Sequence, residues 1–492
     1  MTADLRRLAL TVLQPGYEGT TPPDWLRRAL GEGLGGAVLF ARNRPDAAHV
    51  RELRAANPEV IVAIDEEGGT VTRLEVETGS SFPGNRALGV VDDVKLTERV
   101  GRQIGRMLAE ADITLDYAPS ADVNSNPANP VIGVRSFGPA PDLVARHTVA
   151  YVAGIQGAGV AACAKHFPGH GDTTTDSHLA LPAVHASAES LAERDLPPFR
   201  AAIEAGVQSI MCGHLLIPAL DPGTPSTFSR AILTELLRDE LGFEGMLVTD
   251  AIEMEAVAAM YPPGEIAVRA LGAGADAICV GLTTEEGLNE ITGAIVAAVR
   301  DGVLPEERLA EAAARVRALS GWYARQAARR EQAVADVDPG VGLDAARAAL
   351  TVTGTARLTR PPLVIEVNTR FSKAVDPSMP TGLTAELTRL LPGTERVRLE
   401  PGGELPPMGE PEATRAPEDE APSHGGRPVV LVVHDAARHA WVRDRVAQAV
   451  RSRPDTIVVD TGIPDVPSGA AHLATHGVSR VSARAAAEWL TR

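Results

Sequence analysis

The sequence predicts an α/β protein made of a (β/α)8 barrel followed by a smaller C-terminal α/β sandwich domain. The first observation is that eight short apolar segments recur between Leu8 and Gly281, each ending in polar or glycine-rich residues. The second is that helical patterns such as "RAILTELLRDELG" separate most of them. Apolar strands alternating with helices are typical of a parallel sheet buried on both faces. Eight such units over about 320 residues favour a closed TIM barrel over an open sheet.

Polar side chains at the ends of these segments are the candidates for chemistry. The eight segments are "LALTVLQPG", "GAVLFARN", "VIVAIDEEGG", "ITLDYAPSADVN", "GVAACAKHFPGHG", "SIMCGHLLIP", "GMLVTDAIEM" and "DAICVG". In a barrel, the carboxyl ends of the strands and the loops that follow them form the active face. We therefore expect one mouth to collect Asp65, Asp122, Asn124, Lys165, His166, His214 and Asp250.

The chain beyond the barrel reads as a second domain. We expect the barrel over residues 1–330, a linker over 331–345 and the sandwich domain over 346–492. The second domain holds the apolar runs "PPLVIEV", "RPVVLVVHD" and "DTIVVDTG". Within it, the segment near 400–428 is rich in Pro, Gly and Glu and lacks an apolar period, which predicts a flexible excursion.

Composition narrows the class of partner and the compartment. The formal charge of −17 argues against nucleic acid or an anionic membrane as a partner, because both require a basic surface. Cys163, Cys212 and Cys279 each sit in an apolar run, so we expect buried thiols without disulfides, as in a reducing compartment. The N-terminus lacks a secretory pattern and no segment reaches membrane-spanning length. We therefore expect a cytoplasmic protein; the sequence does not predict its oligomeric state.

The loop "AKHFPGHGDTTTDSHLALP" is dense in histidine and could serve several kinds of chemistry. His166 and His170 have the four-residue spacing of helical metal ligands, but Pro168 and Gly169 lie between them and disfavour a helix. The two glycines match neither the P-loop nor the dinucleotide fingerprint. We expect neither a metal nor a cofactor. The glycines and threonines are expected to let the loop move.

Acid–base chemistry is the remaining interpretation of this loop. Asp176 and His178 are two residues apart and can face the same way in an extended segment. A carboxylate beside an imidazole stabilises the protonated ring and fixes its tautomer, so the pair could donate and then accept a proton. Alternatively, Asp176 only pins the loop and His178 is solvated. Asp250, at the end of the seventh segment, could be a nucleophile or the N-cap of the next helix.

Four motifs carry a resemblance to a known family. They are "KHFPGHGDTTTDSH", "GMLVTDAIEM", "IDEEGGTVTRL" and "GHLLIPALDP". Together they resemble the β-N-acetylhexosaminidase branch of glycoside hydrolase family 3, over residues 5–325 and more loosely over the C-terminal domain. The resemblance implies a retaining double displacement on β-linked N-acetylglucosamine. It makes Asp250 the nucleophile and His178 the general acid/base, oriented by Asp176, in place of the usual pair of carboxylates.

The resemblance also implies which residues bind the sugar. These are Asp65, Arg73, Arg135, Lys165 and His166. Charged groups suit this task because they form strong hydrogen bonds. An alternative for Arg73 is a salt bridge with Glu66 or Glu67. Val134 stands where relatives often have an acidic residue, so we expect Arg135 to be positioned more loosely.

The expected activity is that of a metal-independent exo-β-N-acetylglucosaminidase, a glycosidase acting on a small amino-sugar substrate. Cell-wall muropeptides, in peptidoglycan recycling, or chito-oligosaccharides are the expected substrates. A first alternative is a phosphorylase on the same residues, because an imidazole does not repel phosphate as a second carboxylate would. A second is a catalytically silent sugar-binding protein. A third, a barrel lyase or aldolase, would need a Schiff-base lysine, for which Lys165 is the candidate. The role of the C-terminal domain is left open.

Overall fold

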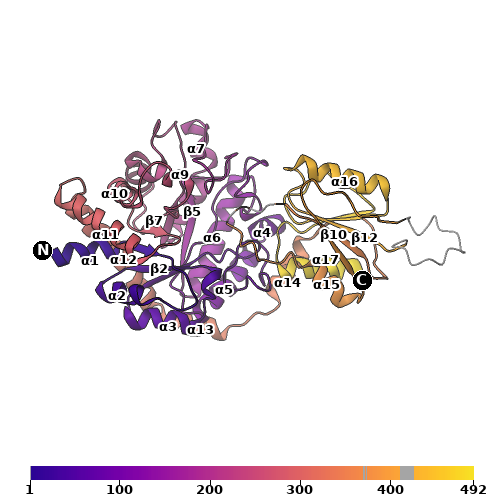
Figure 1. Cartoon of the computed structure of the whole chain (residues 1–492), viewed down its shortest axis with the longest axis horizontal. Coiled ribbons are helices and arrows are strands. Elements are labelled where there is room, and N and C mark those ends of the chain that lie inside the picture. The colour runs from indigo at the N-terminus through magenta and orange to yellow at the C-terminus, as the bar shows by residue number, and fades with distance from the viewer. Residues whose placement is uncertain (1, 370–371, 373, 410–425) are drawn as a thin grey trace, which may run out of the picture.

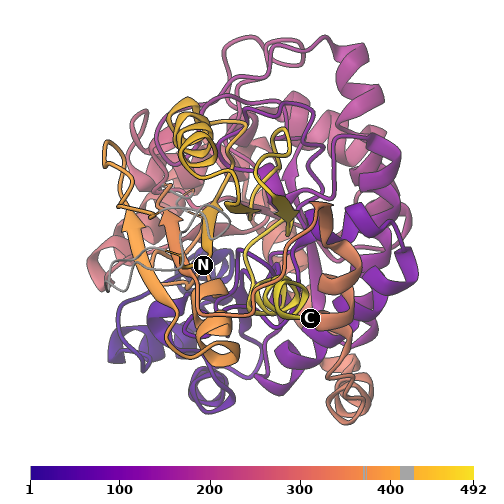
Figure 2. The same ribbon diagram turned by 90° about the vertical axis from the view of Figure 1, so that its right-hand side faces the viewer.

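The computed structural model describes residues 2–369, 372, 374–409 and 426–492. The chain forms two parts that lie side by side along the long axis of the molecule (Figure 1). The N-terminal part, indigo to magenta, carries the first eight strands, and the C-terminal part, orange to yellow, carries a second sheet. Viewed from the right-hand side of that picture, the C-terminal part lies in front of the N-terminal part (Figure 2).

The N-terminal strands are parallel and follow one another in sequence order. They are β1 (Leu13–Pro15), β2 (Gly36–Leu39), β3 (Ile61–Ile64), β4 (Leu115–Asp116), β5 (Ala161–Phe167), β6 (Ser209–Cys212), β7 (Met246–Thr249) and β8 (Ile278–Val280). Each lies within one of the eight apolar segments. The prediction of an α/β protein with a parallel sheet is therefore confirmed.

These strands curl toward a ring. Strands β2 to β7 form one sheet in sequence order, and β1 pairs with β8. A parallel bridge between Val248 and Ala277 joins β7 to the segment just before β8. Between β1 and β2, Gly35 donates a backbone hydrogen bond to Leu10 (3.1 Å), and no ladder joins these two strands in the described part of the chain. The structure therefore has the curled parallel sheet of a TIM-like domain without a continuous eight-stranded ladder.

Alternating side chains of the strands build two apolar layers. On β3, Ile61 and Ala63 belong to a cluster inside the ring, whereas Val62 and Ile64 belong to the larger cluster between the strands and the helices. This division follows from the two-residue period of a strand. Both faces of the sheet are buried, so the loops at the strand ends are held on a rigid base.

Helices cover the outside of this ring. They are α1 (Thr2–Thr11), α2 (Asp24–Glu32), α3 (Ala47–Ala56), α4 (Asn85–Val91), α5 (Val94–Glu110), α6 (Pro141–Gly157), α7 (Ala188–Arg194), α8 (Pro197–Glu204), α9 (Glu255–Ala258), α10 (Pro263–Ala273), α11 (Glu285–Arg300) and α12 (Glu306–Arg325). Three short 3-10 turns are η1 (Ala41–Asn43), η2 (Gly133–Arg135) and η3 (Ser226–Phe228), and η4 (Ala231–Glu240) is a π-helix of ten residues. Asp93 is the N-cap of α5, and its carboxylate accepts from the backbone amides of Lys95 and Leu96, which satisfies free donors of the first turn.

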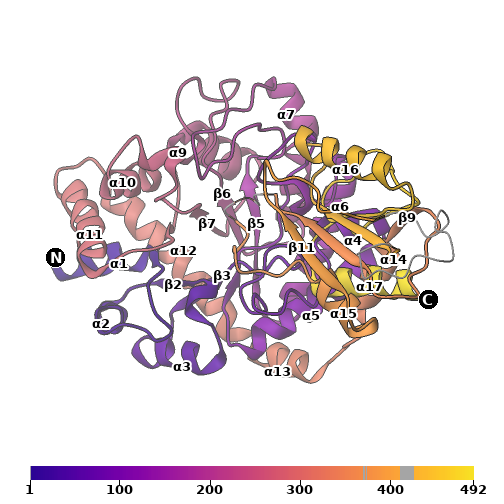
Figure 3. The same cartoon turned by 45° about the vertical axis from the view of Figure 1, so that its right-hand side comes forward.

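The C-terminal part is a six-stranded sheet with helices on both faces. Its order is β11 (Glu395–Leu399), β10 (Leu363–Val367), β12 (Val429–Val433), β13 (Ile457–Asp460), β14 (Ala471–Ala474) and β9 (Thr351–Gly354), with only β9 antiparallel to its neighbour. Helices α15 (Leu383–Leu390) and α17 (Arg480–Thr491) cover one face, and α16 (Ala440–Ser452) covers the other (Figure 3). The carboxyl ends of the parallel strands form one edge of this sheet, and that edge carries loops toward the N-terminal part.

The residues predicted as a linker, 331–345, lie mostly in helices α13 (Ala327–Ala335) and α14 (Val341–Ala349). Helix α14 packs against α4 and α17, and Val341 and Ala345 belong to the N-terminal apolar core, which explains why this stretch is helical and buried. The domain boundaries themselves stay a prediction. Of the segment near 400–428 that we predict to be flexible, residues 410–425 lie outside the described residues.

All three cysteines are buried free thiols, as predicted. Burial raises the pKa of both Cys163 and Cys212 to about 12, so neither thiol is a ready nucleophile. Within the described ranges, no helix has the length and apolar character needed to cross a bilayer.

Candidate active site

A cavity of about 420 Å³ lies at the carboxyl ends of the N-terminal strands. The predicted site residues that line it are Asp65, Arg73, Arg135, Lys165, His166, His178 and Asp250. Asp65 follows β3, Lys165 and His166 end β5, and Asp250 follows β7. Parallel strands place these ends at one mouth, so residues far apart in the sequence share one pocket. Asp176 joins them through a hydrogen bond to His178.

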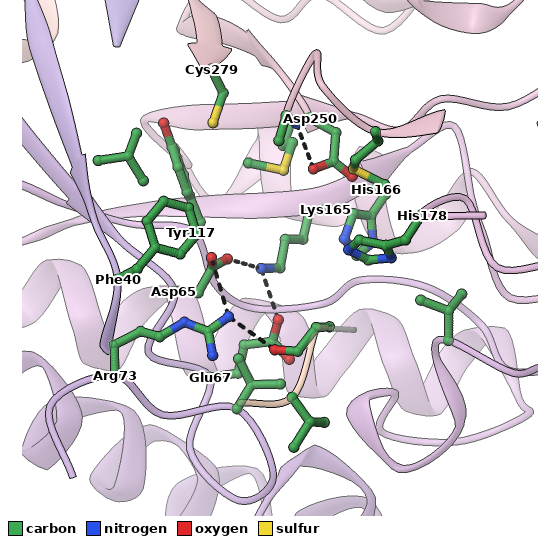
Figure 4. Close-up of a pocket in the computed structure, with 18 of the residues that line it drawn as sticks. Phe40, Asp65, Glu67, Arg73, Tyr117, Lys165, His166, His178, Asp250 and Cys279 are labelled. Atoms are coloured by element: carbon green, nitrogen blue, oxygen red, sulfur yellow. Dashed lines mark hydrogen bonds and ion pairs between the residues drawn. The ribbon is translucent and has the colours of Figure 1, made fainter. Parts of the chain in front are cut away.

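Two cations and two carboxylates form a network in the pocket, and Figure 4 labels three of them, Lys165, Asp65 and Glu67. Lys165 Nζ lies 2.6 Å from Asp65 Oδ1 and 2.8 Å from Glu67 Oε1. Glu67 also binds the Arg135 guanidinium with both carboxylate oxygens, at 2.7 and 3.0 Å. Burial alone would lower the pKa of Lys165, but Asp65 and Glu67 outweigh this effect and hold it above its usual range. Burial alone would raise the pKa of Glu67, but Arg135 and Lys165 outweigh this effect and hold it below its usual range. Glu67, Arg135 and Lys165 therefore stay charged, and the ion pairs hold them in place.

Arg73 lies beside Asp65 and not beside the two glutamates considered as alternative partners. Its Nη2 is 3.8 Å from Asp65 Oδ2 and donates to the carbonyl of Ala374 at 2.9 Å. Glu66 instead accepts the backbone amides of Arg73 and Leu74, and burial raises the pKa of Glu66 to about 7. Glu66 therefore shapes the loop after β3, while the Arg73 side chain faces the pocket.

Arg135 is held firmly despite the apolar residue before it. Its side chain is 7% exposed, is bound by Glu67, and donates to the carbonyl of Val131 at 3.1 Å. The prediction that Val134 leaves Arg135 loosely positioned is therefore wrong, because Glu67, from another loop, supplies the missing carboxylate.

His166 is fixed by a buried carboxylate. Its Nδ1 lies 2.7 Å from Asp122 Oδ2, and its backbone amide also donates to Asp122. Burial opposes ionisation of Asp122, but His166 and other donors hold the pKa of this carboxyl below its usual range. Since Nδ1 is engaged, Nε2 is the nitrogen of His166 left for a ligand.

Asp176 and His178 form the predicted pair. His178 Nδ1 lies 2.7 Å from Asp176 Oδ1, which also accepts the His178 backbone amide at 3.0 Å. Burial alone would raise the pKa of Asp176, but the hydrogen bonds from His178 hold it below its usual range. The His178 side chain is 24% exposed, and its Nε2 has no hydrogen-bond partner among the described residues. Asp176 therefore both pins the loop and orients the ring, leaving one nitrogen for a substrate.

Buried contacts anchor the loop that carries this pair. The ring of His170 bonds Thr173 through Nδ1 (2.8 Å) and Ser177 through Nε2 (3.1 Å). Burial lowers the pKa of His170 to about 4, so this ring is neutral and structural. A Cβ on Gly171 would lie 1.7 Å from the carbonyl oxygen of Val123. In the structure, Gly171 and Thr173 are therefore tightly packed, and the expected mobility of the loop stays a prediction.

Asp250 does not cap a helix. The next helix, α9, begins at Glu255 with Met254 as its N-cap, so the capping alternative is wrong. The Asp250 carboxylate accepts the Ala251 amide at 2.8 Å and lines the pocket close to His166 and His178 (Figure 4). Burial would raise the pKa of Asp250, but the neighbouring imidazoles, His166 first, hold it below its usual range. The carboxylate is therefore ionised and able to attack.

His214 holds the backbone next to Asp250 in place. Its Nδ1 contacts the Thr227 hydroxyl (2.6 Å) and its Nε2 donates to the carbonyl of Ala251 (3.1 Å). Burial lowers the pKa of His214. His214 therefore acts on the backbone beside Asp250 and is not one of the residues that line the pocket.

Glu67 and the segment 374–377 are among the lining residues of the pocket that sequence reasoning missed. Glu67 stands two residues after Asp65, and its place in the same acidic motif could have marked it. Residues 374–377 of the C-terminal part also line the cavity, and no local pattern marks them. Within the described ranges, no group of three or more His, Cys, Asp or Glu residues is placed to hold a metal ion.

Comparison with known proteins relates the chain to one family of glycosyl hydrolases. Residues 30–319 match the model of the glycosyl hydrolase family 3 N-terminal domain. β-Hexosaminidase A of Pseudoalteromonas piscicida is 38% identical over an alignment of 283 residues, which covers 52% of this chain and 47% of that protein. A β-hexosaminidase of Neisseria meningitidis serogroup C is 36% identical over 266 residues and is matched over 73% of its length. The chain thus spans about half of the first relative.

Solved structures resemble this chain over a larger share of its length than the curated relatives do. A glycoside hydrolase family 3 β-N-acetylglucosaminidase from Paenibacillus sp. str. FPU-7 superposes with a TM-score of 0.83 at 33% identity, covering 99% of this chain and 96% of that one. A β-N-acetylhexosaminidase from Beutenbergia cavernae superposes with a TM-score of 0.59 at 30% identity, covering 64% of this chain and 98% of that one.

Proposed function

The chain belongs to glycosyl hydrolase family 3, and on that premise we propose that it is a retaining exo-β-N-acetylglucosaminidase. Its substrates in this proposal are cell-wall muropeptides or chito-oligosaccharides with a terminal β-linked N-acetylglucosamine. The observation that carries the proposal is one pocket holding an ionised carboxylate, Asp250, and an oriented imidazole, His178, beside a charged network. These are the two kinds of group that a double displacement requires.

The first step forms a glycosyl-enzyme. A carboxylate oxygen of Asp250 attacks the anomeric carbon while protonated His178 gives its Nε2 proton to the leaving oxygen, so the aglycone departs as an alcohol. In the second step His178 takes a proton from water, the hydroxide attacks the same carbon, and Asp250 is released as a carboxylate. Asp176 stabilises the protonated ring before the first step and after the second.

The charged network suits recognition of sugar hydroxyls. Asp65, Arg73, Arg135, Lys165 and His166 offer acceptors and donors that are already fixed by buried ion pairs. Fixed polar groups lose little entropy on binding, and charged groups make the stronger hydrogen bonds. In this proposal they hold the terminal sugar with its anomeric carbon against Asp250.

Turnover of a chromogenic β-N-acetylglucosaminide, with and without phosphate, tests the proposal. Hydrolysis independent of phosphate, abolished by Asp250→Ala while sugar binding persists, is the expected result. A rate that requires phosphate, with a sugar 1-phosphate as product, would replace the hydrolase by the phosphorylase alternative. Binding of the sugar without any turnover would favour the alternative of a catalytically silent sugar-binding protein.

We also propose the domain division and the setting. The two sheets have separate apolar clusters, which supports a catalytic barrel over 1–330 and a C-terminal sandwich domain over 346–492, joined through 331–345. A cytoplasmic role in peptidoglycan recycling is the setting that fits a muropeptide substrate. Product analysis on a muropeptide and on chitobiose tests the substrate class.

A further inference from the structure

A second cavity, of about 620 Å³, lies in the C-terminal part. Residues at the carboxyl ends of four parallel strands line it: Glu366 and Val367 on β10, Arg398 on β11, Val432 and Val433 on β12, and Thr461 just after β13. Its volume falls within the range of about 300–1,000 Å³ that is usual for small-molecule sites. It exceeds the 420 Å³ of the catalytic pocket.

The topology of the sheet places this cavity at a switch point. The chain runs from β10 to β11 on one side of β10, and then returns to β12 on its other side. Connections therefore leave β10 and β12 in opposite directions, with α15 on one face and α16 on the other. In open parallel sheets a crevice forms at such a point, outside the carboxyl ends of the strands, and ligands bind there.

The lining combines polar groups with apolar walls. Thr369 is 3% exposed, and its hydroxyl has no hydrogen-bond partner among the described residues. The Asp376 carboxylate accepts from Ser378, and no cation of the described chain pairs with it. Glu366 forms ion pairs with Arg396 (2.5 Å) and with Arg398 (4.0 Å), the arginine that also lines the cavity. An unpaired carboxylate disfavours an anionic ligand, whereas free hydroxyl and carboxylate groups suit a ligand rich in hydroxyls.

The second cavity shares a wall with the catalytic pocket. Val375, Asp376 and Pro377 line both cavities. Two hydrogen bonds connect the neighbouring residues to the catalytic site. The carbonyl of Ala374 accepts from Arg73 (2.9 Å), and the Ser372 hydroxyl lies 3.4 Å from Asp176. A ligand in the second cavity would therefore rest on the backbone that borders the catalytic pocket.

We propose that this cavity is a second binding site, for a small neutral saccharide of one or two rings. The hydroxyls of the sugar donate to Asp376 and accept from Thr369, and its apolar faces pack on Val375 and Val433. This site adjoins the proposed catalytic pocket, with which it shares Val375, Asp376 and Pro377, and performs no chemistry. It assigns to the C-terminal part a role in binding sugar beside the site of cleavage.

Calorimetric titration of the Asp250→Asn protein with N,N′-diacetylchitobiose, up to millimolar concentrations, tests this inference, because a chain without its proposed nucleophile does not consume the ligand. We expect two sites per chain. Met379→Trp, which fills the second cavity from an irregular segment, should leave one site. Val466→Trp adds the same bulk at a position 76% exposed and outside the cavity, and should keep both.

Three results would overturn the inference: one site in the Asp250→Asn protein, no measurable binding, or two sites in a folded Met379→Trp variant. N-acetylglucosamine 6-phosphate adds a test of the chemistry, since it should bind the second site at least tenfold more weakly than the uncharged sugar. Equal binding of the two sugars would contradict the neutral class. Hydrolysis by the unsubstituted chain reports on the proposed function separately, so either proposal can fail alone.

Discussion

Replacing Asp176 with asparagine removes the charge beside His178 and keeps an oxygen in nearly the same place. Asp176 Oδ1 accepts both the backbone amide and the ring Nδ1–H of His178, at 3.0 and 2.7 Å. Two donors at one oxygen require the carbonyl of the new amide there, so its NH2 group turns toward Ser372, near Oδ2. The variant should therefore keep the tautomer of the ring and lose only the charge.

The magnitude follows from the kind of hydrogen bond that is lost. A bond to a charged group contributes about 1.5–3 kcal/mol and a neutral one about 0.5–1.5 kcal/mol, a difference of roughly 1–2 kcal/mol. At about 1.4 kcal/mol per tenfold, kcat/KM for chitobiose should fall roughly 5- to 30-fold. A dinitrophenyl glycoside needs no proton on its leaving group, so its kcat/KM should fall much less.

Steady-state kinetics on these two substrates is the assay. Ser372→Ala serves as the matched control, because it removes the 3.4 Å contact on the other oxygen of Asp176 and the 3.3 Å bond from the Ala374 amide to the same hydroxyl. Both contacts are long for hydrogen bonds, so we expect a change of about twofold or less. Equal losses on both substrates, or no loss on chitobiose, would refute the role of the Asp176–His178 pair in proton transfer.

Three further predictions concern the framework of the pocket. Glu67→Gln leaves two buried cations short of a carboxylate and should cost about 3–5 kcal/mol, measured as a large drop in melting temperature; an unchanged melting temperature would contradict this. His170 has a folded pKa of about 4 against 6.5 unfolded, so its contribution to stability is present above pH 6.5 and falls by ~3 kcal/mol as pH drops to 4. His170→Gln should therefore lose less melting temperature over that interval than the unsubstituted chain, and an identical slope would refute the assignment. Gly171→Ala, whose Cβ meets the Val123 carbonyl, should lower both melting temperature and kcat, and normal kinetics would show that the loop tolerates displacement.

Sequence reasoning located the strands and expected the residues at their carboxyl ends to share one pocket, because both depend on local pattern. Each apolar segment is a buried strand, and Asp65, Lys165 and Asp250 stand where such strands end. The parallel sheet then brings them together without further information. Asp176 and His178 are near neighbours in the chain, so their pairing also needed only a local argument.

Contacts between segments far apart in the chain could not be predicted from the sequence. The bond between Arg73 and the carbonyl of Ala374 joins residues 301 positions apart and depends on how the C-terminal part docks. The same holds for Glu67 supporting Arg135 across 68 positions. Helix α14 forms within the predicted linker because Val341 and Ala345 find places in the N-terminal core, which no pattern in that stretch indicates.

Trapping the covalent intermediate tests the central claim most directly. A slowly turned-over 5-fluoro N-acetylglucosaminyl donor, followed by mass spectrometry of the intact chain and of its peptides, measures which residue carries the sugar. The account predicts one sugar per chain, attached to the peptide that contains Asp250, and no adduct in Asp250→Ala. An adduct on another residue, or inactivation without an adduct, would contradict the double displacement at Asp250.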